Sequence, residues 1–346
     1  MMGGDHNIYC LHRVDNALRR RVASVIIALY LVIAFCAGVY ADPTPDPYDV
    51  MRAAIMSQGQ VDYSAERIVT IFSRDRAPRI VHQKLIRRRG DKQRIETLRP
   101  PSDAGCLVVS DGTILWEYDP HNRVVTRRQL QPPATRQADR ARAAELIKHG
   151  VRLQHTGRHK IAERTADAIV IRDLSGKLLR KCWVDAVTGV RLKTEKHDSS
   201  GAPYSSSEIT AIDYSPNFTA ATFSFRPPAG VTVNKMPAPA RRMSIAAAEK
   251  LAGFSAVIPK HLPPGYVFEA DNVAVTKYCD HLTLWLTFSN GVMSFSLFET
   301  PWRENTQQAA RPSRSATQWY DNGICFTLVG DLRTAEVENL RHRLKR

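Results

Sequence analysis

Short runs of β-branched and aromatic residues, separated by turn-forming residues, occupy most of the chain between residues 65 and 226. Pairs such as Asp111-Gly112 suit these turns, because Asp and Gly tolerate positive φ or form side-chain-stabilised turns. Strands so close in sequence pair with their neighbours as antiparallel hairpins. We therefore expect a β-rich meander with strands at residues 67–73, 79–87, 93–98, 106–110, 113–118, 123–128, 151–154, 168–172, 181–185, 190–196, 207–214 and 222–226.

Two segments in this region have helical rather than strand composition. The stretch from Ala134 to His149 is rich in Ala, Arg, Glu and Leu, and Gly150 ends it. A shorter helix is expected from Pro47 to Gln58, before the first strand. We expect both to accompany the sheet.

A second domain is expected after a Pro-containing basic segment. Residues 234–243, with Pro237 and Pro239, have the composition of an extended linker between a domain at 42–233 and one at 244–346. Ser244 is a suitable N-cap for a helix ending at Ala252. Strands at 267–277, 282–288, 292–299 and 323–329, a polar loop at 300–318 and a helix at 334–344 complete a small α+β unit.

The N-terminus has the layout of an export signal. Basic residues at 13 and 19–21 precede the apolar run from Val22 to Val39, which ends in a small-x-small string at Ala41. A signal peptide over residues 1–41 is the main interpretation, and a retained membrane anchor at 22–41 is the alternative, since about 20 apolar residues can span a bilayer. In both cases the rest of the chain is extracytoplasmic or periplasmic, which argues against cytosolic nucleic-acid binding.

The exported part is strongly basic. The formal net charge is +15, and the first 41 residues contribute +2 through four Arg and two Asp, so the remainder carries +13. A basic surface attracts anionic lipid head groups, lipopolysaccharide or acidic partner segments. The runs Arg87–Arg89 and Arg241–Arg242 are interpreted as a solvated strand end and part of the linker, with contact to phosphates or acidic chains as the alternative.

The four cysteines after the leader do not form a metal or redox motif. No C-x-x-C pair or nearby histidine has the spacing of metal ligands, so no metal and no cofactor is expected. Cys279 and Cys325 lie in the same predicted domain and are a possible disulfide in an oxidising compartment, with buried free thiols as the alternative.

The sequence also contains no recognisable catalytic motif. It has no Gly-rich phosphate loop, no G-x-S-x-G elbow and no H-E-x-x-H. Cys279, Asp280 and His281 include nucleophile, orienter and base types, but adjacent residues on a strand point to opposite faces. We therefore expect a protein that is not an enzyme, with no catalytic residues.

Aromatic residues on the predicted strands indicate a hydrophobic ligand site. In the strand at 113–118, alternation places Ile114, Trp116 and Tyr118 on one face. A curved antiparallel sheet with such residues on its concave side can hold acyl chains, whereas a filled core is the alternative for each single residue. The candidate ligand-binding residues are Ile114, Trp116, Tyr118, Trp183, Phe223 and Phe225.

Three segments resemble the LolA-like half-barrel superfamily of lipoprotein carriers. They are Ser110–Pro120 (SDGTILWEYDP), Trp183–Leu192 (WVDAVTGVRL) and Phe223–Val231 (FSFRPPAGV). The resemblance implies an antiparallel half-open β-barrel wrapped on helices. The carriers have a single domain, whereas this chain has more than 100 further residues.

A two-domain relative accounts for the extra length. The chain resembles the sigma-E factor regulatory protein family (RseB/MucB), which joins a LolA-like half-barrel to a small C-terminal domain. The similar segments are Arg79–Gln83 (RIVHQ), Arg94–Glu96 (RIE), Leu286–Phe298 (LTFSNGVMSFSLF) and Phe326–Asp331 (FTLVGD). Asn290 stands where that family's hairpin turn has Asp, and the four exported cysteines are not part of its pattern.

The resemblance implies a non-catalytic periplasmic regulator. Such a protein binds the extracytoplasmic segment of a membrane anti-sigma factor and releases it when a lipidic envelope-stress signal binds. Its further partners would be lipid, lipoprotein or lipopolysaccharide, and no nucleic acid is expected. The alternative is a lipid or lipoprotein carrier of the LolA type.

Overall fold

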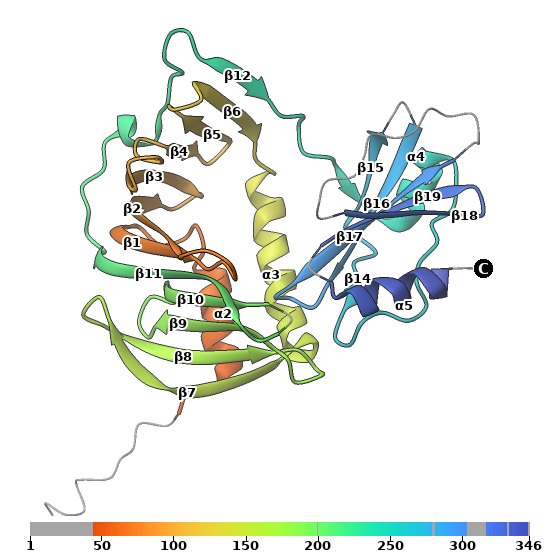
Figure 1. Ribbon diagram of the computed structural model, residues 1–346, viewed down its shortest axis with the longest axis horizontal. Helices are drawn as coiled ribbons and strands as arrows, with labels where there is room; N and C mark the ends of the chain where they lie inside the picture. The colour runs from red at the N-terminus through yellow and green to blue at the C-terminus, as the bar shows by residue number, and fades with distance from the viewer. Residues whose placement is uncertain (1–43, 199, 279–280, 303–315, 331, 345–346) are drawn as a thin grey trace, which may run out of the picture. The chain divides into compact units, whose positions relative to one another are not determined.

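The structure contains two β-sheets in one compact unit. It is a computed structural model that describes residues 44–198, 200–278, 281–302, 316–330 and 332–344. Residues from Pro45 onward form that unit. A twelve-stranded sheet is built from the first part of the unit and a seven-stranded sheet from the last part (Figure 1).

The large sheet is an open, β-rich meander, which confirms the predicted fold class. Its order is β12-β6-β5-β4-β3-β2-β1-β11-β10-β9-β8-β7, so β12 and β7 are its edges. Neighbours are antiparallel except β12, which runs parallel to β6. The strands are β1 (Tyr63–Ile71), β2 (Arg79–Arg88), β3 (Lys92–Arg99), β4 (Leu107–Asp111), β5 (Ile114–Asp119), β6 (Val124–Gln129), β7 (Arg152–Ile161), β8 (Arg164–Arg172), β9 (Leu178–Asp185), β10 (Arg191–His197), β11 (Pro203–Asp213) and β12 (Thr232–Lys235).

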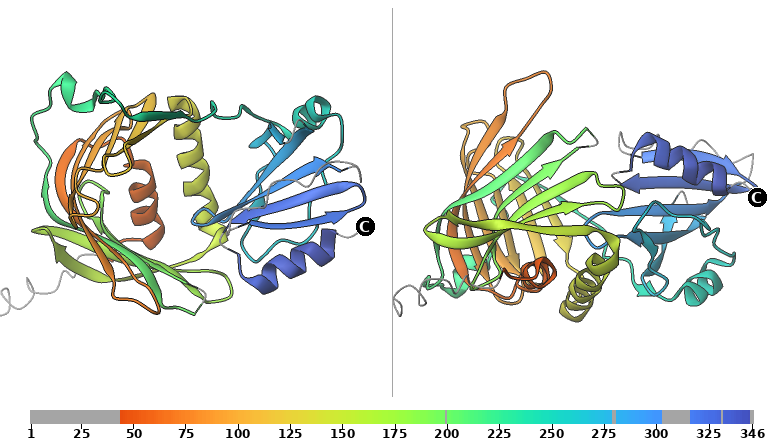
Figure 2. Two further views of the ribbon diagram at one scale, coloured as in Figure 1. Left: turned by 45° about the horizontal axis from the view of Figure 1, so that its top comes forward. Right: turned by 90° about the horizontal axis from the view of Figure 1, so that it is seen from below.

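Two helices lie inside the curve of this sheet. They are α2 (Pro47–Met56) and α3 (Pro133–Gly150), and Figure 2 shows both on its concave side. Met51 and Ile55 of α2 join Ile147 of α3 in one buried cluster with Ile169 of β8 and Cys182 of β9. The sheet therefore buries its inner apolar residues against helices instead of closing into a barrel.

The turn between β9 and β10 holds α2 in place. The buried carboxylate of Asp185 accepts hydrogen bonds from the backbone N–H groups of Val187 and Thr188, and Arg164 Nε lies 2.8 Å from its Oδ2. At the end of this turn, Gly189 has φ +71, and a Cβ there would lie 3.0 Å from the carbonyl oxygen of Ala53 in α2. The segment Trp183–Leu192 thus has a structural role, which is to form a tight turn that the helix can approach.

The hairpin between β2 and β3 is tied to α3 through Asp91. Arg136 donates from Nε to Asp91 Oδ2 at 2.9 Å, and Arg140 also donates to this carboxylate. Burial by itself would raise the pKa of Asp91, but the hydrogen bonds from Arg140 and Arg136 outweigh it and hold the pKa below its ordinary value. The two guanidinium groups thus stabilise the charged carboxylate.

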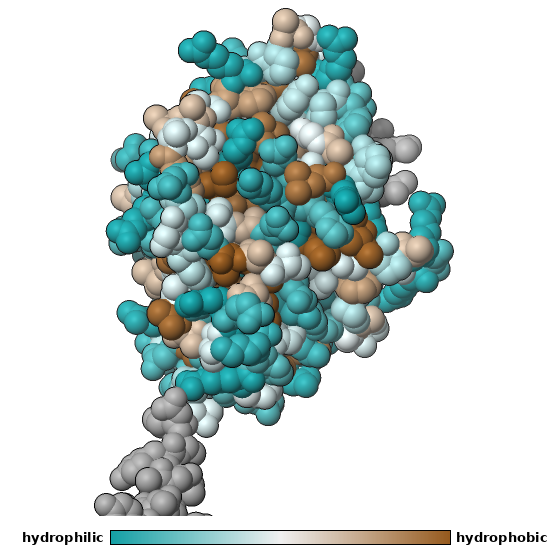
Figure 3. Space-filling model, turned by 90° about the vertical axis from the view of Figure 1, so that its left-hand side faces the viewer, coloured by the Kyte–Doolittle hydropathy of each residue, from teal (hydrophilic) through white to brown (hydrophobic). Residues whose placement is uncertain are grey.

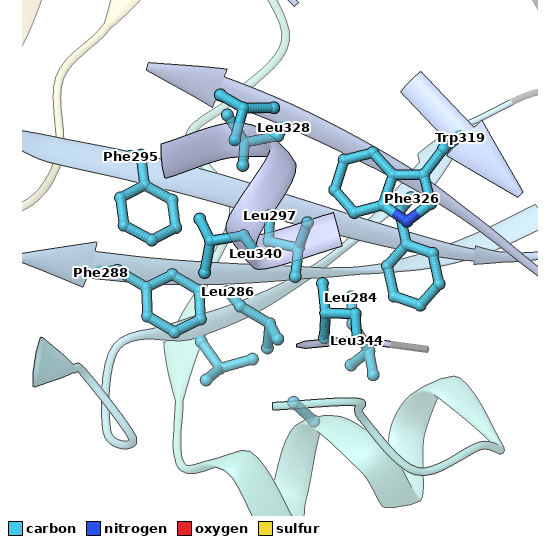
Figure 4. Packing of buried hydrophobic residues seen from close by; sticks show 13 residues of the cluster. Leu284, Leu286, Phe288, Phe295, Leu297, Trp319, Phe326, Leu328, Leu340 and Leu344 are labelled. Carbon is cyan, nitrogen blue, oxygen red and sulfur yellow. The ribbon is translucent and has the colours of Figure 1, made fainter. Parts of the chain in front are cut away.

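The C-terminal sheet encloses its own core. It comprises β13 (Arg242–Met243), β14 (Val267–Phe268), β15 (Val273–Tyr278), β16 (His281–Ser289), β17 (Ser294–Pro301), β18 (Ala316–Asp321) and β19 (Ile324–Gly330). Helices α4 (Ile245–Ala252) and α5 (Thr334–Leu344) contribute to a cluster that includes Leu284, Phe295 and Phe326 (Figure 4). The rings of Phe288 and Phe295 are stacked, with 4.7 Å between centroids.

Three sequence expectations were wrong in detail. The strand predicted at 222–226 does not form: residues 222–223 end a 3₁₀ helix, η1 (Ala220–Phe223), which Thr219 and Thr222 cap through their side chains, and 224–226 have no regular secondary structure. The first two residues of the predicted linker, 234–235, belong to β12, whose residues are all exposed and show no apolar alternation. The predicted polar loop at 300–318 ends in β18, where Trp319 is buried. The rest of that loop, 303–315, lies outside the described residues.

The membrane-related expectations fall largely on undescribed residues. Residues 1–43 lie outside the described part, so the signal peptide and the alternative anchor at 22–41 stay predictions. In the part of the chain that the structure describes, no helix is both long and apolar enough to cross a bilayer. The domain limits at 42–233, 234–243 and 244–346 also stay predictions.

Replacing Asp185 by Asn tests the importance of the β9–β10 turn. Burial would raise the pKa of Asp185, but hydrogen bonds from Arg164, the backbone and Tyr214 lower it. Because its pKa is lower in the folded state, ionisation of Asp185 stabilises the fold above pH of about 4 and this contribution is lost as the pH falls through the folded pKa. Asp185→Asn should lower the free energy of unfolding by about 2 kcal/mol at pH 7, and less at pH 3, in urea titrations.

The matched control is Asp213→Asn. Asp213 is exposed and accepts one backbone hydrogen bond, from Ser215 N at 2.9 Å. Asp213→Asn should lower the free energy of unfolding much less than Asp185→Asn does at pH 7. Equal effects of the two substitutions would contradict the role given to the Asp185 turn.

Candidate functional site

Cross-strand register determines which side chains face the helices. Cys182 packs with α2, and its partners across the sheet are Thr194, then Ser207, then Val69 of β1. Ala65 lies four residues before Val69 on β1 and therefore points to the same face. The partners of Ala65 across the following strands are Leu85, Ile95, Val108, Glu117 and Thr126. We call this the inner face.

The predicted ligand-binding residues of β5 lie on the opposite, outer face. Glu117 points inward, so Ile114, Trp116 and Tyr118 point outward. The ring of Phe225 lies 5.8 Å from those of both Trp116 and Tyr118. The chain between β11 and β12 crosses the outside of the sheet, and η1 lies against β3 and β4 (Figure 1). Phe225 thus packs onto the outer face from outside.

The other two predicted residues pack in different places, and Trp183 contacts the buried cluster that contains Ala65 and Leu85. Phe223 is buried, and its ring lies 5.6 Å from that of Phe218 in the same crossing segment. Trp183 follows the inward-facing Cys182, so it points outward, and the Lys193 ammonium lies 5.1 Å from its ring. Strand alternation thus places Ile114 and Trp116 on the outer face, whereas Tyr118 also borders a cavity of about 440 Å³, and the ligand-binding role of the six residues stays a prediction. The strand alternation was read correctly, but it does not say which face receives the helices.

The outer face does not present a continuous apolar surface. Figure 3 looks at this side of the molecule and shows hydrophobic residues scattered among hydrophilic ones. Arg127 covers Trp116, with 5.7 Å between the guanidinium carbon and the ring centroid. A ligand-binding role for the aromatic residues has not been tested and stays a prediction.

Two cavities open on the inner face. One, of about 440 Å³, is lined by inward-facing residues that include Ile95, Val108 and Thr126. The other, of about 380 Å³, lies between the helices and the sheet and is lined by Met51 and Ile55 of α2 together with Ile171, Arg180 and Arg191. Both combine apolar walls with a few polar groups, which is typical of ligand-binding cavities.

Four of the arginines on the inner face form a group, which we call the inner arginine cluster. Arg67 and Arg87 share this face with Ala65 and Leu85, and register also places Arg180 and Arg191 there, beside Ile171 and Val184. All four side chains are partly buried. The Nε atoms of Arg87 and Arg180 are fully buried and have no hydrogen-bond partner. The cluster consists of Arg67, Arg87, Arg180 and Arg191.

The members of the cluster are close enough to affect one another's protonation. Burial, and next the charge of Arg87, lower the pKa of Arg67 to about 10. Burial also lowers the pKa of Arg191, and the charges of Arg180 and Arg87 act in the same direction. An arginine whose pKa is lowered in this way is still charged at neutral pH. The inner face therefore has concentrated positive charge.

No carboxylate among the described residues forms an ion pair with this cluster. Arg67 donates to the neutral side chain of Gln83, at 3.1 Å from Nε, and Arg87 donates to that of Gln93. Asp139 lines the same cavity as Arg191, but its carboxylate is bonded to Arg142 at 3.0 Å. Buried charges are usually paired, so these four are unusual.

The C-terminal sheet has one face packed by α4 and α5 and a second, opposite face. Leu284 and Leu286 point into the core with α4 and α5, so Trp285 between them points to the second face. There the Trp285 ring lies 5.2 Å from that of Phe298 and 4.1 Å from the guanidinium carbon of Arg242. Tyr320, 48% exposed, lies on the same face. This second face thus carries aromatic side chains beside a guanidinium group.

The predicted cysteine pair is only partly described. Cys279 and Asp280 lie outside the described residues, so the disulfide between Cys279 and Cys325 stays a prediction. The Cys325 sulfur is buried and accepts a hydrogen bond from Gln318 Nε2 at 3.0 Å. Among the residues that the structure describes, no group of three His, Cys, Asp or Glu side chains is arranged to hold a metal ion.

Sequence reasoning missed the inner arginine cluster. The run Arg87–Arg89 was interpreted as a solvated strand end, yet Arg87 points inward while Arg88 and Arg89 are exposed. One sequence signal could have identified the cluster. Arg87 follows Leu85 by two residues, so on a strand it points to the same face as that apolar residue. Only the curvature of the sheet brings the arginines of β1 and β2 near those of β9 and β10.

Comparisons with known proteins establish the fold. No protein-family description matches the chain, and no curated protein matches its sequence. The crystal structure of MucB in complex with MucA(peri) has 15% identity over 85% of this chain and 97% of that chain, with a TM-score of 0.52. The complex of Pseudomonas aeruginosa MucA and MucB has 16% identity over 86% and 97%, with a TM-score of 0.54.

A LolA superfamily protein from Nitrosomonas europaea matches 52% of this chain and 98% of its own at 12% identity, but its TM-score of 0.27 is too low to support an argument. The MucB structures, in contrast, match along most of both chains. The resemblance drawn from the sequence is thus confirmed at the level of structure: this chain has the fold of MucB.

Proposed function

We propose that this protein is a non-catalytic extracytoplasmic regulator that binds the periplasmic segment of a membrane anti-sigma factor. The observation that carries the proposal is the shared fold with MucB, which was solved in complexes with MucA. The sequence resemblance to the RseB/MucB family points to the same kind of partner. Fold alone does not determine function, so the proposal also needs a surface that suits a partner.

The second face of the C-terminal sheet suits a protein partner. Trp, Tyr and Arg are the residues that contribute most often to binding energy at interfaces. Arg242 stacks on Trp285 there, Tyr320 lies on the same face at the far edge strand β18, and the indole N–H of Trp285 is already satisfied by Ser296 Oγ at 2.8 Å. A partner can therefore cover the ring without leaving a polar atom unsatisfied.

The inner cavities of the large sheet suit a lipidic signal. Apolar residues such as Met51, Ile55 and Val108 line the two inner cavities, at positions where an acyl chain would be shielded from water. A lipid or lipoprotein carrier would use the same cavities, and this is the alternative function. The two functions differ in whether a protein partner binds as well.

Release of the partner requires that the lipid and the partner favour different states of the protein. The C-terminal domain contacts the half-barrel through α3, where Arg142 NH1 lies 3.1 Å from Glu269 Oε2. Val292 packs against the cluster that contains Ile147. We propose that occupancy of the inner cavities shifts α3 and alters this contact, which lowers affinity for the partner.

A pull-down from native envelopes with residues 45–346 as bait tests the proposed function. We expect it to recover a single-span membrane protein with a cytosolic sigma-binding domain, detected by mass spectrometry. Recovery of lipoproteins or lipids without such a protein would support the carrier instead.

Truncation of Trp285 should weaken the binding of this partner. Trp285→Ala removes the aromatic side chain at the centre of the second face, so we expect at least about ten-fold weaker binding in titrations with the recovered partner's periplasmic segment. The control is Ile80→Ala, which truncates a 50% exposed side chain on β2. Circular dichroism melting identifies any variant that fails to fold. Unchanged affinity in a folded Trp285→Ala variant would place the partner on another surface.

Filling an inner cavity should block the lipid. Thr126→Trp places an indole in the cavity of about 440 Å³, and we expect it to lose most of the binding of a fluorescent fatty acid. The control, Thr210→Trp, adds the same side chain at an exposed position of β11. If both variants bind the fatty acid as the wild type does, the cavity is not the lipid site.

A further inference from the structure

In the part of the chain that the structure describes, the four partly buried arginines of the inner arginine cluster have no carboxylate paired with them to offset their positive charge. Their mutual repulsion and the loss of hydration both disfavour the charged forms, yet arginine does not give up its proton at neutral pH. Such a cluster is stabilised when an anion binds among the guanidinium groups. The inner arginine cluster thus calls for a negatively charged ligand.

We propose that the inner arginine cluster is an oxyanion site that takes a phosphate group. Arg67 and Arg87 approach it from β1 and β2, and Arg180 and Arg191 from β9 and β10. Planar guanidinium groups bind phosphate oxygens in pairs, and several of them can share one dianion. The unpartnered Nε atoms of Arg87 and Arg180 are available donors for it.

The surroundings favour a phosphate over a metal ion or a cationic ligand. The cavity between the helices and the sheet has only one lining carboxylate, Asp139, and this is paired with Arg142. Arg140, which also lines this cavity, is paired with Asp91. The charge left unbalanced in this cavity is therefore that of Arg180 and Arg191.

The neighbouring larger cavity is a useful contrast. It has a volume of about 670 Å³ and also includes Arg180, but its acidic residues balance much of the positive charge. Asp198 pairs with Arg74, and Glu336 pairs with Arg333. The larger cavity therefore has more carboxylates beside its basic residues than the inner cavity has.

The phosphate can come from two sources, free inorganic phosphate or the head group of a phospholipid. The cavity of about 380 Å³ combines Arg180 and Arg191 with the apolar side chains of Met51, Ile55 and Ile171, so both sources fit. The oxyanion site does not depend on the proposed partner. It can be present whether or not an anti-sigma factor binds.

Stability and binding measurements on residues 45–346 test the site. Inorganic phosphate should raise the melting temperature above that in chloride at equal ionic strength, and calorimetry should show saturable binding. Arg191→Gln and Arg87→Gln should each weaken phosphate binding by at least about ten-fold, because each removes charged hydrogen bonds. Without phosphate, both variants should melt at or above the wild-type temperature, because a repelling charge is gone. This last result also shows that they fold.

The control and the conservative variant separate a site from general basicity. Arg152→Gln makes the same charge change at an exposed position of β7 and should bind phosphate like the wild type. Arg191→Lys keeps the charge without the planar fork and should bind with an affinity between those of wild type and Arg191→Gln. Wild-type phosphate affinity in Arg191→Gln and Arg87→Gln, or an equal loss in Arg152→Gln, would overturn the proposal.

Two further ligands identify the source of the phosphate. Glycerol 3-phosphate and monomeric dihexanoylphosphatidylglycerol are titrated in the same way. Similar affinities for inorganic phosphate and the lipid assign the site to free phosphate, whereas lipid binding at least about ten-fold tighter assigns it to a head group. No binding of any of the three would overturn the site, and the envelope pull-down would still decide the partner independently.

Discussion

The packing of α2 and α3 against the inner face of the large sheet is the interaction on which the rest of the structure depends. An open sheet with apolar residues on one face must cover that face, and the two helices do so through the cluster around Met51, Ile147 and Cys182. Two buried or half-buried carboxylates, Asp91 and Asp185, hold the turns to which the helices dock. The same packing keeps the sheet curved and leaves space between helix and strand.

This packing places polar side chains where a filled core would exclude them. The strands β1, β2, β9 and β10 each place one arginine of the cluster at an inward position, and curvature brings these four strands into one neighbourhood. A solvated surface would disperse their charge, whereas a partly buried one concentrates it. The large sheet therefore combines the two properties of an amphiphile site, apolar walls and localised charge, in one concave face.

The C-terminal domain uses the opposite arrangement. Its apolar residues, such as Phe288 and Phe295, are packed under α4 and α5, and its second face carries aromatic residues among hydroxyl groups. The two sheets thus differ in which of their faces the helices cover. Contacts from α3, including Arg142 with Glu269, link the two parts.

The sequence by itself determined the meander, both long helices and most strands of the C-terminal sheet, because hydrophobic alternation and turn residues are local signals. It could not predict β12, whose exposed residues pair with β6 only because the chain returns there, nor η1, whose threonine caps compete with a strand pattern. Local alternation showed that Ile114, Trp116 and Tyr118 share a face. Only the tertiary structure decided that this face is the outer one, because the side that receives the helices depends on how distant strands curve. For the same reason, the grouping of Arg67 and Arg87 with Arg180 and Arg191 exists only in the folded protein.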